Sequence, residues 1–141
     1  VEESQEPGAL AQAHNILGVL SKGQGDLENA ITHLKQSLRI AESLGGPEAR
    51  VAALNNLAST YGANDEHQRA IDLATEALDL CETWGDQHRL AAIHNNLADL
   101  FHSIGNTDAS MSHLTEAAGL FAEIGSDADE MQPEIWKLVE W

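Results

Sequence analysis

The sequence predicts an all-α protein built as a solenoid of three helical hairpins with a C-terminal capping helix. Three observations support this prediction. The same residues recur every 40 positions, each 40-residue unit contains two amphipathic helix patterns, and no segment alternates as a β-strand does. Hydrophobic residues make up 43% of the chain and aromatic residues only 4%, so the core must consist mainly of Ala and Leu. Closely packed helices suit that composition better than a sheet.

The repeat becomes visible when the chain is aligned with itself at an offset of 40 residues. Asparagines share one position of all three units, leucines follow two residues later, and a glycine closes each unit. The aligned sets are Asn15, Asn55 and Asn95; Leu17, Leu57 and Leu97; and Gly45, Gly85 and Gly125. A single domain spanning 1–141 is therefore predicted, with repeats at about 8–45, 48–85 and 88–125 and a cap at 126–141.

The second repeat shows the helix patterns most clearly. Its first helix carries an apolar stripe at the spacing i, i+3, i+4, i+7, formed by Leu54, Leu57, Ala58 and Tyr61. A turn at Gly62–Asp65 follows, where we expect Asn64 or Asp65 to cap the next helix. The stripe of the second helix consists of Ala70, Ile71, Ala74, Ala77, Leu78, Cys81 and Trp84. Gly85 is expected to end that helix, as Gly commonly does.

The other repeats and the tail follow the same logic. Repeat one turns at Lys22–Asp26 and repeat three at Ile104–Asp108. The tail, Ser126–Trp141, carries Pro133, which fits the first turn of a short helix. Its apolar residues would cover the exposed end of the last hairpin, as a terminal repeat requires. They include Ile135, Trp136, Leu138 and Val139, and Trp136 and Trp141 are also candidates for a contact with another domain or copy.

These motifs resemble the tetratricopeptide repeat (TPR) family, in its 40-residue variety found in kinesin light chains and Gα-regulatory scaffold proteins. The motifs are Leu17-Gly18 with Ala30, Leu57-Ala58 with Tyr61 and Ala70, and Leu97-Ala98 with Phe101 and Ser110. Ser21 replaces the usual aromatic residue and Ser110 the usual Ala, which we expect to weaken local packing. The segments HNNLADLFHSIG, LFAEIG and PEIWKLVEW look like the C-terminal TPR end of a larger bacterial signalling protein. The resemblance implies a right-handed superhelix whose first helices line a concave, peptide-binding groove.

A helical wheel places one polar strip of each first helix on that groove. Its central residues, Asn15, Asn55 and Asn95, are called the asparagine ladder below. The flanking candidates for binding a peptide or partner are Gln12, Val19, Lys22, Ser59, Asp99 and His102. Asn disfavours helices, and its carboxamide offers both donors and an acceptor to a peptide backbone. The alternative is that the ladder bonds only to a neighbouring hairpin or to water. Asn56 and Asn96 are expected to bond across the boundary between hairpins.

Charge and composition make several functions unfavourable. The net charge of −16 disfavours nucleic acid and anionic membranes as partners, and no apolar run is long enough for a membrane span. The single Cys81 fits a reducing compartment, so a cytoplasmic location is expected. Seven His residues show no i, i+4 pair and no HExxH motif, and no nucleophile elbow or phosphate loop is present. We therefore expect no catalytic residues, no metal site and no cofactor. Because the chain begins at Val1, we expect a fragment or a processed chain.

The predicted function is a non-catalytic protein–protein interaction module that binds a peptide or partner segment in its concave groove through the asparagine ladder. The alternative is self-association as a homo-oligomer, or intramolecular contact with a tethered ATPase or cyclase-like domain of a larger signalling protein. The sequence does not name the partner or the oligomeric state. It also does not show whether the chain's own termini occupy the groove.

Overall fold

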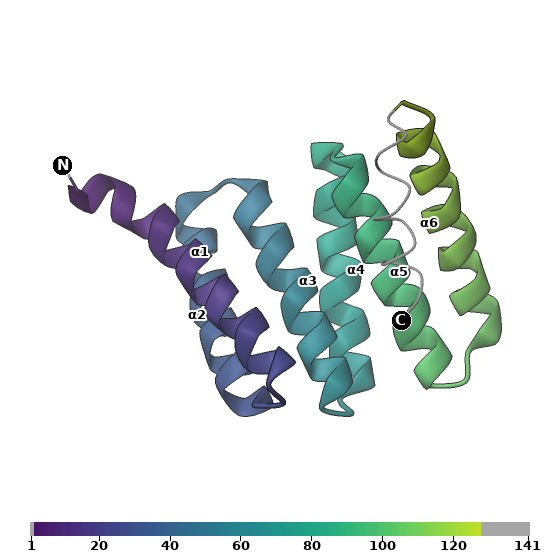
Figure 1. Ribbon diagram of the computed structural model, residues 1–141, viewed down its shortest axis with the longest axis horizontal. Helices are drawn as coiled ribbons and strands as arrows, with labels where there is room; N and C mark the ends of the chain where they lie inside the picture. The colour runs from purple at the N-terminus through teal and green to yellow at the C-terminus, as the bar shows by residue number, and fades with distance from the viewer. Residues whose placement is uncertain (1, 128–141) are drawn as a thin grey trace. The chain divides into compact units, whose positions relative to one another are not determined.

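The computed structural model describes residues 2–127, which form six α-helices and no strand. The helices are α1 (Glu2–Gly23), α2 (Leu27–Leu44), α3 (Pro47–Ala63), α4 (His67–Trp84), α5 (Gln87–Ser103) and α6 (Thr107–Asp127). They pair as three hairpins, α1–α2, α3–α4 and α5–α6, in the order that the repeat predicts (Figure 1). The prediction of an all-α helical repeat protein is therefore confirmed. The predicted cap lies outside the described residues.

Local sequence signals set the helix ends. Helix α2 is capped by Asp26, whose carboxylate accepts the backbone N–H of Asn29 at 3.2 Å. At its other end Gly45 adopts a left-handed conformation (φ 84°) and donates its N–H to the Ala41 carbonyl. Pro47 then occupies the first position of α3, where its missing N–H costs nothing. Asp86 caps α5 in the same way as Asp26 caps α2.

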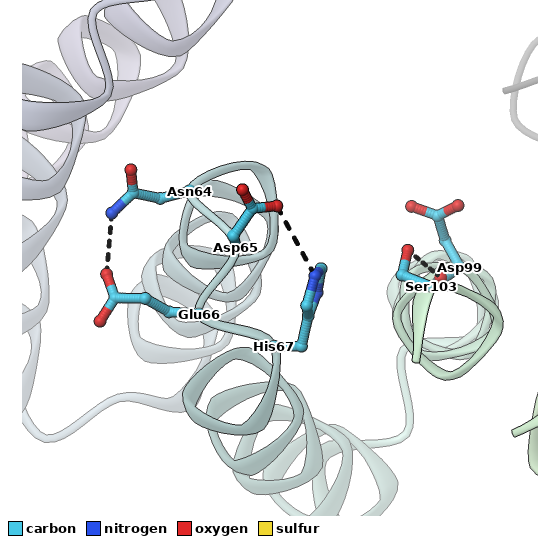
Figure 2. Close-up of polar contacts among 6 residues, drawn as sticks. All are labelled: Asn64, Asp65, Glu66, His67, Asp99 and Ser103. Atoms are coloured by element: carbon cyan, nitrogen blue, oxygen red, sulfur yellow. Dashed lines mark hydrogen bonds and ion pairs between the residues drawn. The ribbon is translucent and has the colours of Figure 1, made fainter. Parts of the chain in front are cut away.

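The turn inside each hairpin uses a positive φ at the same repeat position. That position is occupied by Gly25 (φ 83°), Asp65 (φ 64°) and Gly105 (φ 82°). The expectation that Asn64 or Asp65 caps α4 is wrong, because α4 begins only at His67 and Asn64 is instead the C-cap of α3. Figure 2 shows the Asn64 amide donating to Glu66, at 2.9 Å, and the Asp65 carboxylate turned toward His67, 3.7 Å away.

The chain divides into two compact units. Val1–Leu80 contains α1, α2, α3 and most of α4, and Cys81–Trp141 contains the end of α4 with α5 and α6. In the first unit, α3 packs against both α1 and α2. The predicted stripe of α3 lies in its core, since Leu54, Leu57, Ala58 and Tyr61 are all buried, whereas Leu78 of the α4 stripe is half-buried. In the second unit, Ala91 packs with Ala117, Phe121 and Ile124.

The two helices of hairpin one approach each other closely at Gly18. A Cβ added to Gly18 would lie 2.5 Å from Cγ of Leu34, a fully buried side chain. Hairpin two has Ala58 and Ala74 at the equivalent positions, both fully buried. In hairpin one, the Leu34 side chain of α2 fills the space that a side chain at position 18 of α1 would occupy.

Two buried serines bond to the facing helix of their own hairpin. Ser37 Oγ donates to the Ala11 carbonyl at 2.7 Å, and Ser110 Oγ donates to the Ala98 carbonyl at 2.8 Å. We expected Ser110 to weaken packing because it replaces the usual Ala. The structure instead gives its hydroxyl a buried acceptor, so the polar group is satisfied.

The third hairpin ends later than the repeat predicts. Helix α6 continues through Gly125 to Asp127, although the equivalent Gly45 is the left-handed C-cap of α2. Gly125 is buried within α6 and does not end the helix.

Candidate interaction site

The first unit brings six of the predicted binding residues onto two adjacent helices. These are Gln12, Asn15, Val19 and Lys22 on α1, with Asn55 and Ser59 on α3. The side chains of Gln12 and Val19 are exposed, and the other four are half-buried. Because α3 packs against α1, the two strips are neighbours. This part of the predicted groove therefore presents a mostly polar surface with a single formal charge, on Lys22.

A side-chain hydrogen bond joins α3 to the strip on α1. Asn56 Nδ2 on α3 donates to Asn15 Oδ1 on α1 at 2.9 Å. The expectation that Asn56 bonds across the boundary between hairpins is confirmed. The bond uses one lone pair of the Asn15 side-chain oxygen. It does not involve the NH₂ group of Asn15 or the second lone pair of that oxygen. Asn15 thus has a structural contact in addition to its predicted role in binding.

The second unit places the other three predicted residues on α5. Asp99 and His102 are exposed, whereas Asn95 is buried, with 7% of its surface accessible. The Ser103 hydroxyl donates to the backbone carbonyl of Asp99 at 3.0 Å, which leaves the Asp99 carboxylate out of that bond (Figure 2). Asn95 therefore presents less surface to a ligand than its half-buried counterparts Asn15 and Asn55.

Two contacts between histidine rings were not predicted from the sequence. His14 Nδ1 lies 3.0 Å from His33 Nδ1, and His94 Nδ1 lies 2.9 Å from His113 Nδ1. Each pair connects the first helix of a hairpin to its second helix. The available signal was the repeat itself, because both members of the second pair lie 80 residues after those of the first.

The environment of the second histidine pair disfavours its charged forms. Burial lowers the pKa of His94, against the opposite influence of Glu116 and Glu82. Burial also lowers the pKa of His113, and the neighbouring His94 adds to this effect. The Phe101 ring stacks on His113, with centroids 5.5 Å apart and ring planes inclined by 4°. Both imidazoles therefore favour the neutral state.

The described residues contain no candidate metal site, one buried thiol and no helix suited to crossing a membrane. Across 2–127, no group of three or more His, Cys, Asp or Glu is placed to hold a metal ion. Cys81 is buried, as predicted, and burial raises the pKa of its thiol. In the same part of the chain, no helix has the length and apolar character needed to cross a membrane.

A second surface consists of exposed apolar side chains on α1. Five are at least 44% exposed, which is unusual for residues of this kind in one helix: Leu10, Ile16, Leu17, Val19 and Leu20. Leu17 is 44% exposed, whereas Leu57, at the equivalent position of α3, is 2% exposed. Leu20 is 56% exposed, whereas its equivalent Thr60 is fully buried.

Tandem helical hairpins with polar strips on their first helices define a class of protein–protein interaction modules. The chain belongs to the tetratricopeptide repeat family, whose model matches residues 9–83 and 50–123. The resemblance seen in the Leu-Gly/Ala motifs is thereby confirmed.

Individual proteins support the same assignment. The chain is 25% identical over 129 residues to outer dynein arm-docking complex subunit 4 of Danio rerio, covering 92% of this chain and 24% of that protein. It is 28% identical over 102 residues to the photosystem I assembly protein Ycf3 of Synechococcus elongatus, covering 72% and 57%. It is 27% identical over 124 residues to KINESIN LIGHT CHAIN-RELATED 3 of Arabidopsis thaliana, covering 84% and 19%. The chain thus spans less than two thirds of each of these relatives.

Solved structures agree on the fold. The TPR domain of Arabidopsis FLU matches with a TM-score of 0.75 at 16% identity, covering 80% of this chain and 95% of that one. BtubC (BKLC) from P. vanneervenii matches with a TM-score of 0.74 at 23% identity, covering 86% and 50%.

Proposed function

We propose that the chain binds an extended peptide or partner segment along the polar strip of its first helices. The observation that carries this proposal is the pairing of α1 and α3 in the first unit, where Asn15 and Asn55 occupy equivalent, half-buried positions. Carboxamides at a regular spacing can exchange hydrogen bonds with a peptide backbone, while the flanking side chains select sequence. Gln12, Val19, Lys22 and Ser59 would supply that selectivity in the first unit, and Asp99 and His102 in the second.

The asparagines contribute unequally in this proposal. Asn15 and Asn55 are the main ligands for the peptide backbone, because their side chains retain accessible surface. Asn95 contributes less because it is buried. The proposed function is binding alone, with no catalytic step.

The test begins with a random-peptide display library, from which binders of the wild-type chain are selected and their affinities measured. Val19→Arg and Ser59→Arg each place a long charged side chain on the strip. We expect each to weaken binding by about tenfold or more, a loss of about 1.4 kcal/mol, with an unchanged circular dichroism spectrum. Asn55→Ala should weaken binding in the same assay.

Arg39→Ala provides the matched control, since Arg39 is an exposed residue of the second helix α2. It should bind the selected peptides as the wild type does. Equal affinities for the wild type, Val19→Arg and Ser59→Arg would remove the strip from the binding site.

A second candidate function rests on the exposed apolar face of α1. We propose that this face receives a further helical hairpin of the same kind. In the first unit, α3 packs on α1 and α2 and buries the equivalent residues Leu57 and Thr60. The equivalent residues of α1, Leu17 and Leu20, are exposed. This contact would connect the chain to an adjoining part of a longer protein.

The chain itself provides the probe for this contact. A second copy of residues 7–46 is fused to the N-terminal side of Pro7. Gly46 of the added copy then precedes Pro7, as Gly46 precedes Pro47 in the chain itself. The added hairpin should raise the thermal midpoint and reduce the fluorescence of an apolar dye. Replacing Leu17 and Leu20 of the original α1 by Gln should abolish both gains. An unchanged midpoint contradicts the proposal, and a wild-type dimer in light scattering would assign the face to a second copy.

A further inference from the structure

The two histidine pairs have nearly the same geometry. Their ring centroids are 5.3 Å and 5.2 Å apart, and their ring planes are inclined by 30° and 34°. In each pair the centroid separation exceeds the Nδ1–Nδ1 distance by about two ring radii. The two nitrogens therefore face each other along the line that joins the rings. Hairpin two has Leu54 and Leu73 at the same positions.

This arrangement suits a hydrogen bond between nitrogens. One ring donates Nδ1–H and the other accepts with the lone pair of its Nδ1. A first added proton can bind at the outer nitrogen of the donor ring without breaking the bond. A second proton must bind at the accepting Nδ1, where it removes the acceptor. Two positive charges would then face each other at hydrogen-bond distance.

The same arrangement does not suit a metal ion. A metal ion between the two nitrogens of a pair would lie only about 1.5 Å from each, well short of a metal–imidazole bond of about 2.0–2.1 Å. The described residues also add no third His, Cys, Asp or Glu ligand near either pair. Proton binding is therefore the chemistry that the pair supports.

The carboxylates that act on His94 and His113 lie on α4 and α6. Glu82 on α4 and Glu116 on α6 act on His94, and Glu116 also acts on His113. These carboxylates favour the first proton on the pair. Phe101 on α5 stacks on His113 and adds an apolar wall beside that half-buried ring. The second proton would thus bind in a site with an apolar wall and an adjacent imidazolium.

We propose that the His94–His113 pair is an acid-sensitive contact, which holds α5 against α6 until a second proton binds and then releases them. Release would loosen the third hairpin and displace the part of α5 that carries Asp99 and His102. Hairpin two lacks this response because leucines replace both histidines. The proposal concerns the hairpin itself and does not depend on peptide binding in the groove.

The first test follows the imidazole signals of the wild-type chain by NMR as the pH is lowered from about 7.5 to about 5, across the usual histidine pKa of about 6.5. A coupled pair should titrate in two separate steps, the second accompanied by shifts of amide signals in α5 and α6. Two independent single-step titrations without amide shifts would overturn the proposal.

The second test compares amide hydrogen exchange at about pH 7.5 and about pH 5.5, corrected for intrinsic exchange. We expect the amide protection of residues 87–127 to fall about tenfold. This is the change in the opening equilibrium when the open hairpin binds one more proton than the closed hairpin over one pH unit. Protection in residues 47–80, which contain Leu54 and Leu73, should change less than about twofold. The double variant His94→Leu/His113→Leu installs the hairpin-two residues and should remove the pH response. Retention of the full response by a folded double variant would refute the proposal.

Discussion

Asn56 Nδ2 on α3 donates to Asn15 Oδ1 on α1 across 2.9 Å, which connects two consecutive hairpins through side chains that are both half-buried. Asn15 is also a predicted ligand for a peptide. The same carboxamide therefore contributes to stacking of the repeats and to the proposed binding surface. A loss of peptide binding in an Asn15 variant must therefore be compared with the change in its free energy of unfolding.

A double-mutant cycle on Asn15 and Asn56 should show a favourable coupling of about 0.5–1.5 kcal/mol, the net value of one hydrogen bond. The measurement is the free energy of urea unfolding for the wild type, Asn15→Ala, Asn56→Ala and the double variant. Strictly additive losses would contradict a direct bond.

Asp65→Gly should stabilise the chain by about 1 kcal/mol, because Asp65 holds a left-handed conformation (φ 64°) that strains a residue with a Cβ. Gly already occupies the equivalent positions 25 and 105. The reciprocal change Gly25→Asp is the matched control and should lower the thermal midpoint. A lower midpoint for Asp65→Gly would mean that the contact with His67 outweighs the strain.

Gly18→Ala should destabilise the first unit by about 1–3 kcal/mol, because the new methyl group would overlap Leu34. The overlap outweighs the gain in helix propensity, which is about 1 kcal/mol at most. Gly8→Ala in the same helix is the control. No atom lies within 4 Å of its added Cβ, so it should stabilise by about 0.5–1 kcal/mol. Chemical denaturation of both variants measures the contrast.

Stability should fall when the pH is lowered from neutral toward about 5.5. The pKa values of His94 and His113 are lowered in the folded chain, so the unfolded chain binds more protons below its own histidine pKa of about 6.5. The contribution is complete above that value and is lost as the pH falls toward the folded pKa values. Thermal midpoints measured at steps across this range should decrease, and His94→Leu/His113→Leu should flatten the curve.

Cys81 should resist thiol reagents in the native chain. Its side chain is buried, and burial raises the pKa of the thiol, so the reactive thiolate is scarce at neutral pH. Absorbance of a chromogenic disulfide reagent should develop only when urea unfolds the chain. Rapid labelling without denaturant would show that the end of α4 opens in the native state.

The sequence predicted the features that periodicity controls. The 40-residue offset located all three hairpins, and the i, i+3, i+4, i+7 stripe identified Leu54, Leu57, Ala58 and Tyr61 as core. The bond between hairpins by Asn56 also followed from its place on the wheel. The first two depend on spacing along the chain, and the third depends on the face of α3 that carries Asn56, although the wheel did not identify Asn15 as its partner.

The sequence did not reveal features that depend on two helices at once or on the position of a repeat in the array. The contacts of His94 with His113 and of Gly18 with Leu34 join residues that only hairpin geometry brings together. Leu17 matches Leu57 in sequence but not in burial, because Leu57 lies on a helix that packs against a preceding hairpin. The sequence alone does not distinguish a capping role for Asp65 from its left-handed turn, because Asp favours both.

The complementary volumes of Gly18 with Leu34 and of Ala58 with Ala74 also limit how such a gene can recombine. A crossover in the turn of a hairpin would join a first helix carrying Ala58 to a second helix carrying Leu34, and in hairpin one the added methyl group would meet the leucine. A crossover between hairpins, at Gly45 or Gly85, would keep each matched pair together. Hairpin one therefore could not take the first helix of hairpin two without repacking around Leu34, whereas hairpin three combines Ala98 with Leu114, a leucine that is only partly buried.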